Sequence, residues 1–153
     1  MVSRKLSQEK RLLDWMKFIS VLFIIISFYL LYLHYSTSES FCDICQGLSC
    51  DIVNKSPYSE FPPGSGIPVS LMGIITFVIT LYVLHFIKLN KKFIVSSFRI
   101  NKRILADFLF YFMIVGLIFA LYLIYAELFL ILSVCILCVV LDILLVFMII
   151  FSY

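Results

Sequence analysis

FISVLFIIISFYLLYLHY, residues 18–35, is an apolar run without Lys, Arg, Asp or Glu, and its single histidine, His34, comes only at its end. A helix of about 20 apolar residues is long enough to cross the hydrocarbon core of a bilayer. Three further stretches have the same character, at about 68–87, 105–126 and 128–153. The sequence therefore predicts an all-α membrane protein, a four-helix transmembrane bundle with an outer capping loop, in which residues 1–153 form a single domain.

Composition supports this class. The chain of 153 residues is 63% hydrophobic, and its mean hydropathy is +1.13, which is too apolar for a soluble domain of this length. The net charge of +3 is small and gives no indication of nucleic-acid binding. The first span is expected to be a retained signal anchor, because it is long and no small-residue cleavage site follows it.

The distribution of the cations predicts the orientation. Eleven of the twelve Lys and Arg residues lie before the first span or between the second and third, and only Lys55 lies in the segment 36–67. By the positive-inside rule, both termini are expected in the cytoplasm and 36–67 is expected to form the outer loop. The loop contains Pro62-Pro63-Gly64, a strong turn signal, and we expect it to include a short helix. The expected location is a bacterial or archaeal cell membrane or the ER membrane.

All five cysteines are predicted to lie toward the outer side. The fourth span carries a CxxC pair, Cys135 and Cys138, and the outer loop carries Cys42, Cys45 and Cys50. If the fourth helix begins near residue 128, the CxxC lies two turns into it, ~10–15 Å below the outer surface. Spacing i, i+3 places both sulfurs on one helix face, and the nearby helix N-terminus favours the thiolate. This pattern is typical of thiol–disulfide exchange.

Three other interpretations of the cysteines are open at this point. The CxxC could be two inert core residues, since free cysteine is often buried. The loop could hold structural disulfides, but its three cysteines cannot all pair among themselves. Cys42 and Cys45 have the spacing of zinc ligands, but no histidine follows His34 in the loop.

At these residues the chain resembles the vitamin K epoxide reductase family. The similarity covers nearly the whole chain, including the four spans and the order of the cysteines. Three blocks carry it. The outer-loop motif is Cys42-Asp43-Ile44 … Leu48-Ser49-Cys50 … Val53 … Ser56, and the start of a second helix, as in bacterial members, is Gly66-Ile67-Pro68-Val69-Ser70 … Gly73. The corner with the active-site CxxC is Tyr122 … Glu127-Leu128-Phe129 … Cys135-x-x-Cys138.

The resemblance implies a role for each matching residue. Cys42 is expected to take electrons from a partner's thiols and pass them to Cys50. Cys50 then exchanges with Cys135, and Cys138 is the thiolate that faces a quinone. Ser56 is expected near the cysteines or the quinone head group, although an ordinary loop hydroxyl is equally open. The implied partners are a thioredoxin-like (DsbA- or PDI-like) protein on the outer side and a lipid-soluble quinone, either ubiquinone, menaquinone or vitamin K, with no metal.

The chain departs from vertebrate members of that family at three positions. Cys45 is an additional cysteine, which leaves open which loop thiol meets the partner. Val69 and Asp142 stand where vertebrate members have an asparagine and a tyrosine that bind the vitamin K head group. These changes argue against epoxide reduction and leave open the reduction of a quinone in support of disulfide bond formation, as in bacterial members, which is the function we expect. The alternatives are a vitamin K epoxide or quinone reductase of the ER membrane and a non-enzymatic four-helix membrane subunit.

Two acidic residues stand out in the apolar segments. Asp142 follows Cys138 by four residues and Cys135 by seven, so it shares their helical face. An acid at that depth is costly, and we expect it to hydrogen-bond the quinone or serve its proton path, with a helix-packing contact as the alternative. Glu127, at the outer corner, is expected to be solvated, with a helix cap or a proton relay as alternatives.

Overall fold

The computed structural model describes residues 2–36, 42, 47–89, 93–95, 98–100 and 102–152. Their elements are, in order, α1 (Val2–Tyr35), α2 (Cys50–Asn54), the 3₁₀ turn η1 (Pro57–Ser59), α3 (Val69–Leu89), β1 (Phe93–Val95), β2 (Phe98–Ile100), α4 (Lys102–Tyr125), the π-helix η2 (Ala126–Ile131) and α5 (Ile136–Ser152).

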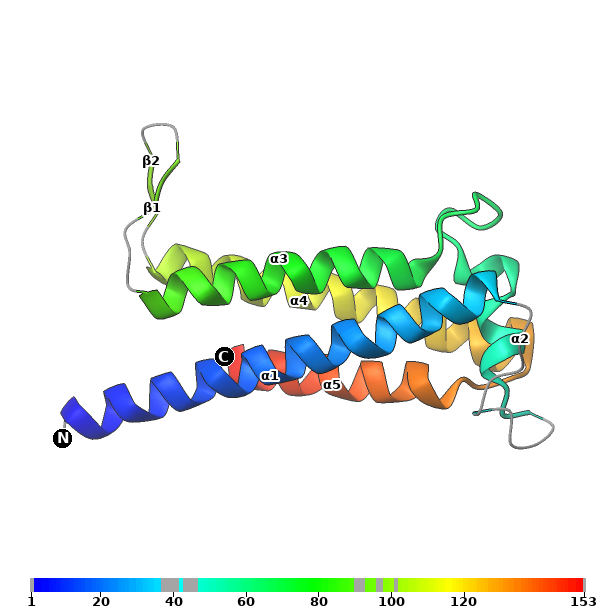
Figure 1. The fold of residues 1–153 in the computed structure, drawn as a ribbon, viewed down its shortest axis with the longest axis horizontal. Helices are drawn as coiled ribbons and strands as arrows, with labels where there is room; N and C mark the ends of the chain where they lie inside the picture. The colour runs from blue at the N-terminus through cyan, green and yellow to red at the C-terminus, as the bar shows by residue number, and fades with distance from the viewer. Residues whose placement is uncertain are drawn as a thin grey trace.

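The long helices α1, α3, α4 and α5 run up and down beside one another (Figure 1). Helix α1 packs along α3, α4 along α5, and α1 also contacts α5. Both ends of the chain and the β1–β2 hairpin lie toward one end of the bundle, whereas α2 lies at the other (Figure 1). The predicted all-α bundle is confirmed, as is the short helix in the loop. The antiparallel pair of strands β1 and β2, in which Phe93 pairs with Ile100, was not predicted from the sequence.

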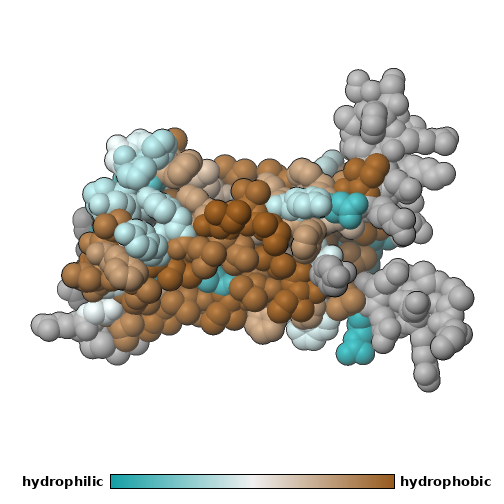
Figure 2. Space-filling view, turned by 180° about the vertical axis from the view of Figure 1, so that it is seen from behind, coloured by the Kyte–Doolittle hydropathy of each residue, from teal (hydrophilic) through white to brown (hydrophobic). Residues whose placement is uncertain are grey.

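Three helical segments are long and apolar enough to cross a membrane within the described part of the chain: Arg11–Tyr35, Val69–Lys88 and Ile104–Ile131. On the face shown in Figure 2, apolar residues form a broad band across the middle of the molecule. Helix α5 is also apolar but has 17 residues, about 25 Å at 1.5 Å per residue, near the lower limit for a span.

The boundary between the last two spans differs from the sequence prediction. The third helical segment does not end near residue 126 but continues through η2 to Ile131, and α5 begins at Ile136 rather than near residue 128. Apolarity alone cannot locate this boundary, because residues 128–132 are as hydrophobic as the helices on either side.

Close packing of α1 against α3 forms the centre of the bundle. The rings of Phe23 and Phe77 are stacked with centroids 3.6 Å apart. Gly73 lies at this contact, where a Cβ atom would be 3.4 Å from the Phe23 ring and from the Ser27 hydroxyl, at van der Waals distance. Small residues at such a contact let membrane helices approach closely.

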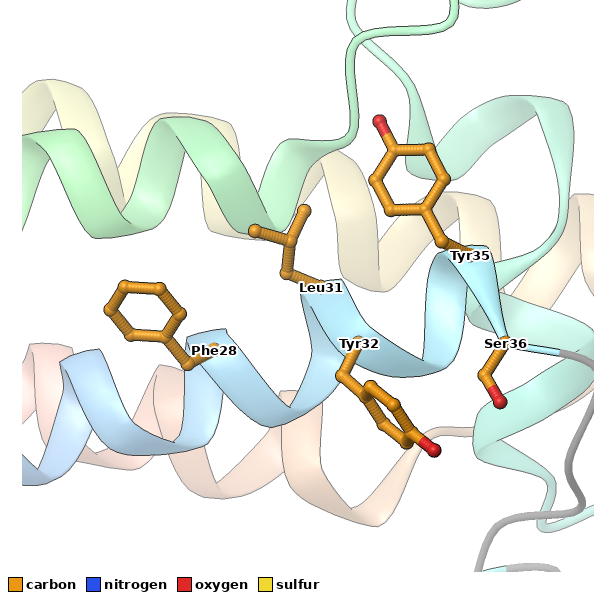
Figure 3. A pocket seen from close by; sticks show the side chains of 5 residues that line it. All are labelled: Phe28, Leu31, Tyr32, Tyr35 and Ser36. Atoms are coloured by element: carbon orange, nitrogen blue, oxygen red, sulfur yellow. The ribbon is translucent and has the colours of Figure 1, made fainter.

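Aromatic side chains also mark one end of α1. Phe28, Tyr32 and Tyr35 project from this helix and, with Leu31 and Ser36, line an open groove of about 550 Å³ (Figure 3). Tyr32 and Tyr35 are exposed, and exposed tyrosines are enriched at the boundary between lipid and water. The position of Tyr35, next to the end that carries α2, fits the interfacial aromatic belt.

We predict that Phe77→Ala lowers the free energy of unfolding by about 3–5 kcal/mol, because the fully buried ring leaves a cavity between α1 and α3. Reversible unfolding in mixed detergent micelles, followed by circular dichroism, measures the effect. Ile75→Ala is the matched control, since Ile75 lies on the same helix with 53% of its surface exposed. Equal losses for the two variants would contradict the packing assigned to Phe77.

Candidate active site

The CxxC pair lies at the very start of α5. Cys135 precedes the first helical residue, and its sulfur accepts a hydrogen bond from the backbone N–H of Cys138 at 3.3 Å. The Cys135 carbonyl accepts the N–H of Val139 at 3.1 Å. Cys135 is therefore the N-cap of α5, with its sulfur in the place of a capping oxygen. The predicted position two turns inside a helix was wrong, because the helix begins later than apolarity suggested.

Capping makes the two sulfurs inequivalent. The hydrogen bond from the Cys138 side chain, helped by backbone N–H groups at the helix start, lowers the pKa of the Cys135 thiol below its ordinary value. A lowered pKa raises the fraction of thiolate, the species that attacks a disulfide. Cys135 is fully buried, whereas Cys138 is partly exposed toward a cavity described below. The contacts of Cys135 thus favour the thiolate form of its sulfur.

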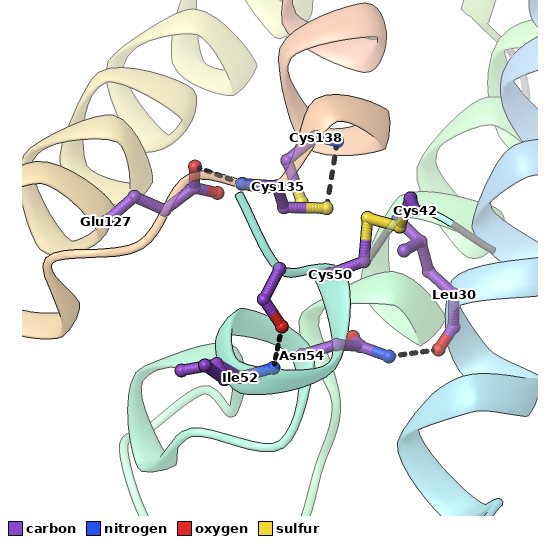
Figure 4. Close-up of a disulfide and its surroundings, with 9 residues drawn as sticks. Leu30, Cys42, Cys50, Ile52, Asn54, Glu127, Cys135 and Cys138 are labelled. Carbon is purple, nitrogen blue, oxygen red and sulfur yellow. Dashed lines mark hydrogen bonds between the residues drawn. A yellow bond between two sulfur atoms is a disulfide. The ribbon is translucent and has the colours of Figure 1, made fainter. Parts of the chain in front are cut away.

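The turn between η2 and α5 is organised around Glu127. Its backbone carbonyl accepts the N–H groups of Leu132 and Ser133. Its side-chain Oε2 accepts the N–H of Cys135 at 3.2 Å (Figure 4). Leu132 has φ 55°, in the left-handed region that a leucine rarely adopts, and this residue reverses the chain. The expectation that Glu127 is solvated was wrong: it is 6% exposed, because the π-helix directs it inward.

The loop disulfide lies against this turn. Cys42 and Cys50 are disulfide-bonded, with Cα atoms 5.8 Å apart, and Cys50 opens helix α2. Cys42, Cys50 and Cys135 belong to one buried cluster, and Figure 4 shows the Cys135 sulfur directed toward the disulfide. Cys45, for which no role was fixed, lies outside the described residues.

Backbone contacts fix this arrangement. Leu48 and Val134 form a parallel bridge, and the N–H of Val134 donates to the Gly47 carbonyl at 2.9 Å. The bridge lies two residues before Cys50 and one before Cys135, so it brings the two cysteines close to each other. This contact joins segments more than 80 residues apart, and no local pattern in the sequence indicates it.

Polar contacts tie α2 to the end of α1. The Asn54 side chain donates from Nδ2 to the Leu30 carbonyl, and the Asn54 carbonyl accepts from Ser59 Oγ and lies 2.6 Å from His34 Nδ1. His34 Nε2 also lies 3.8 Å from Glu60 Oε1. Residues 47–60 thus form a cap over the bundle, which we call the α2 cap.

Beneath the α2 cap lies a cavity of about 420 Å³, between α1, α3, α4 and α5. Its wall is mostly apolar, and Phe77, Phe112 and Phe119 are among its lining residues. Cys138, Asp142 and Glu127 also line it, so the shared face predicted for Cys138 and Asp142 is present. The Ser70 hydroxyl, also in the lining, is buried without a hydrogen-bond partner among the described residues.

Two expected site residues occupy different surroundings. Asp142 is in the cavity lining, whereas Ser56 is not; its hydroxyl donates to the Val53 carbonyl at 2.7 Å and closes the turn after α2. The role of Ser56 toward a quinone stays a prediction. Sequence reasoning missed Asn54 and Ser70 as lining residues, although both lie inside the blocks that carry the family resemblance. Among the described residues, no cluster of His, Cys, Asp or Glu could hold a metal ion.

The geometry offers three connected compartments: a disulfide in the α2 cap, a capped dithiol at the start of α5, and an apolar cavity reached from Cys138. Comparison with protein families finds that the model described as "Vitamin K epoxide reductase family" matches residues 15–153. A comparison with curated proteins finds no match.

We predict that Asn54→Ala makes Cys135 more reactive toward a water-soluble maleimide. Loss of one hydrogen bond between the α2 cap and α1, worth about 1 kcal/mol, should raise the open population and the labelling rate by about fivefold. Mass spectrometry of labelled peptides identifies the modified cysteine. Lys55→Ala is the control, because Lys55 is the next residue in the chain and is exposed. Identical Cys135 labelling in all three proteins would mean that the Asn54 contact does not hold the cap closed.

Proposed function

The chain belongs to the vitamin K epoxide reductase family, and from that premise we propose that it passes electrons from a thioredoxin-like protein to a quinone and so supports disulfide bond formation. Membership makes it a membrane oxidoreductase. The observation that carries the finer proposal is the contact between a disulfide-bonded loop pair and a free CxxC whose second sulfur faces an apolar cavity. The match to residues 15–153 supports treating the chain as one functional unit.

We place the α2 cap on the outer side of the membrane. The single cation of the segment 36–67 is Lys55, whereas the remaining Lys and Arg precede residue 18 or lie between residues 88 and 103 of the sequence. Both termini are then cytoplasmic. The cysteines described above lie at the outer end, where an oxidising compartment allows disulfides to persist.

Exchange between the two cysteine pairs is the first internal step. When the CxxC is a disulfide and the loop pair is reduced, the Cys50 thiolate attacks Cys135 and releases Cys138 as a thiolate. Cys42 then attacks Cys50, which leaves a Cys42–Cys50 disulfide and a free Cys135. The described structure has this product state, with the loop pair bonded and the CxxC free. A thioredoxin-like dithiol then reduces the loop disulfide and becomes oxidised itself.

The cavity has the properties that a quinone ring and its tail require. Ligand pockets of this size are mostly apolar with a few polar groups. This one combines aromatic walls with the buried Ser70 hydroxyl, which has no hydrogen-bond partner within the described part of the chain. A bound quinone would supply the two-electron acceptor for the CxxC. Cys138 would face it as the donor sulfur, while Asp142 and Ser70 would contact its oxygens. The α2 cap and the helices would exclude water from the site.

We predict that Cys138→Ala reduces quinone turnover to background without loss of the folded bundle, because a dithiol is needed to release two electrons. Quinone absorbance with dithiothreitol as reductant provides the rate, and circular dichroism confirms folding. Val139→Ala, a neighbouring exposed position on α5, is the control. A residual rate within about tenfold of wild type would remove Cys138 from the mechanism, since loss of a reacting group costs far more.

We predict that Cys42→Ala stops oxidation of a thioredoxin-like protein and accumulates a Cys50–Cys135 disulfide, because the group that resolves this bond is absent. Non-reducing peptide mapping detects the bridge. Reduction of quinone should persist when the electron donor is a small thiol that reaches the Cys135–Cys138 pair directly. Cys45→Ala is the matched control; if it produces this phenotype and Cys42→Ala does not, the partner meets Cys45 instead.

A further inference from the structure

Glu127 is a buried carboxyl group that the proposed electron route does not use. It is 6% exposed, at the end of a helical segment expected to lie in a membrane. Burial of an acid in apolar surroundings is costly and is common where the group has a function. A single hydrogen bond to the Cys135 N–H could be made by a neutral side chain at lower cost. The choice of an acid at this position therefore requires a further explanation.

The contacts of Glu127 place it between the two reactive cysteines and the cavity. Oε2 accepts the Cys135 N–H at 3.2 Å, and the carboxyl group interacts electrostatically with the Cys138 thiol. Glu127 also lines the cavity together with Cys138. A second acid, Asp142, lies in the same wall and close enough to interact electrostatically with Glu127.

The local backbone holds Glu127 in this position. Residues Ala126–Ile131 form a π-helix, and π-helical turns inside helices occur frequently at functional sites. The wider turn directs the Glu127 side chain toward the start of α5, while its carbonyl holds the N–H groups of Leu132 and Ser133. The carboxyl group is thereby fixed by its backbone as well as by the Cys135 N–H.

We propose that Glu127 is the acid–base residue of the CxxC, giving a proton to the Cys138 sulfur and taking it back. This inference rests on the proposed function and adds a catalytic residue to it. When Cys50 attacks Cys135, the Cys135–Cys138 bond breaks and Cys138 leaves with the electron pair; the Glu127 carboxyl protonates it.

The return of the proton accompanies oxidation of the pair. Formation of the Cys135–Cys138 disulfide passes two electrons to a quinone, and over the whole cycle the two protons of the hydroquinone balance the two that the thioredoxin-like dithiol loses when it is oxidised. Glu127 accepts the proton of Cys138, and Asp142, on the same wall, lies where a proton can pass onward to the quinone oxygens. Among the described residues, the titratable side chains that line this cavity are Tyr58, Glu127, Cys138 and Asp142, and Cys135 contacts Glu127 from the start of α5.

Three substitutions separate proton transfer from helix capping. Glu127→Gln retains an oxygen that can accept the Cys135 N–H but has no transferable carboxyl proton, whereas Glu127→Leu loses both properties. Asp107→Asn is the matched control, an acid on α4 that is exposed and outside the cavity lining. If Glu127 moves protons, Glu127→Gln should slow the single-turnover oxidation of the pre-reduced CxxC by quinone by about a hundredfold or more. Asp107→Asn should match wild type. A wild-type rate in Glu127→Gln, with loss only in Glu127→Leu, would overturn the proposal in favour of capping.

A second measurement needs no quinone. Infrared difference spectra between the oxidised protein and the protein reduced with dithiothreitol should contain a carboxyl C=O band that shifts in D₂O and disappears in Glu127→Gln. Disappearance in Asp142→Asn with retention in Glu127→Gln would assign the proton to Asp142 and overturn the proposal. Absence of the band from wild type would also overturn it. If wild type reduces no quinone, the proposed function fails, whereas the infrared result on Glu127 still decides this inference.

Discussion

The free N–H groups at the start of α5 are the constraint on which the site depends. The first turn of any helix has N–H groups without intrahelical partners, and leaving them unpaired in apolar surroundings is costly. In this chain the Glu127 carboxylate accepts the N–H of Cys135, and the Cys135 sulfur accepts the N–H of Cys138. The same two contacts that end the turn therefore also define the environment of both CxxC sulfurs. If the pair reacts as proposed, one set of hydrogen bonds serves both stability and reactivity at this position.

The α2 cap adds a second, independent set of contacts. Its backbone bridge between Leu48 and Val134 aligns the loop disulfide with Cys135, while Asn54 ties the other end of α2 to α1. Cys50 and Cys135 are both fully buried as a result. Exchange between these two pairs would take place away from water, and a reductant in solution would have to pass through the outer cysteine. This separation gives a physical reason for a relay of two pairs rather than one.

The cavity explains why the acids lie where they do. An apolar wall suits a lipid-soluble acceptor, but a thiol-to-quinone reaction also moves protons, which apolar side chains cannot carry. Glu127 and Asp142 supply titratable groups in the same wall as Cys138. Asn54 and Ser70 add neutral polar groups above them. The combination matches a site where electrons and protons leave together, and it is the reason for assigning Glu127 a chemical role beyond its structural one.

The sequence by itself determined the class of the protein and the helical bundle, and it predicted which cysteines react. Uninterrupted apolar runs such as 18–35 have few stable alternatives to a spanning helix, and the cysteine spacings carried the family resemblance across most of the chain. Only the tertiary structure decided where α5 begins, which residue caps it and that Glu127 is buried. Residues 128–132 are apolar enough for either assignment, and the choice depends on a π-helical turn, a left-handed leucine and a bridge to Leu48. Those contacts join distant segments, so no local periodicity predicts them.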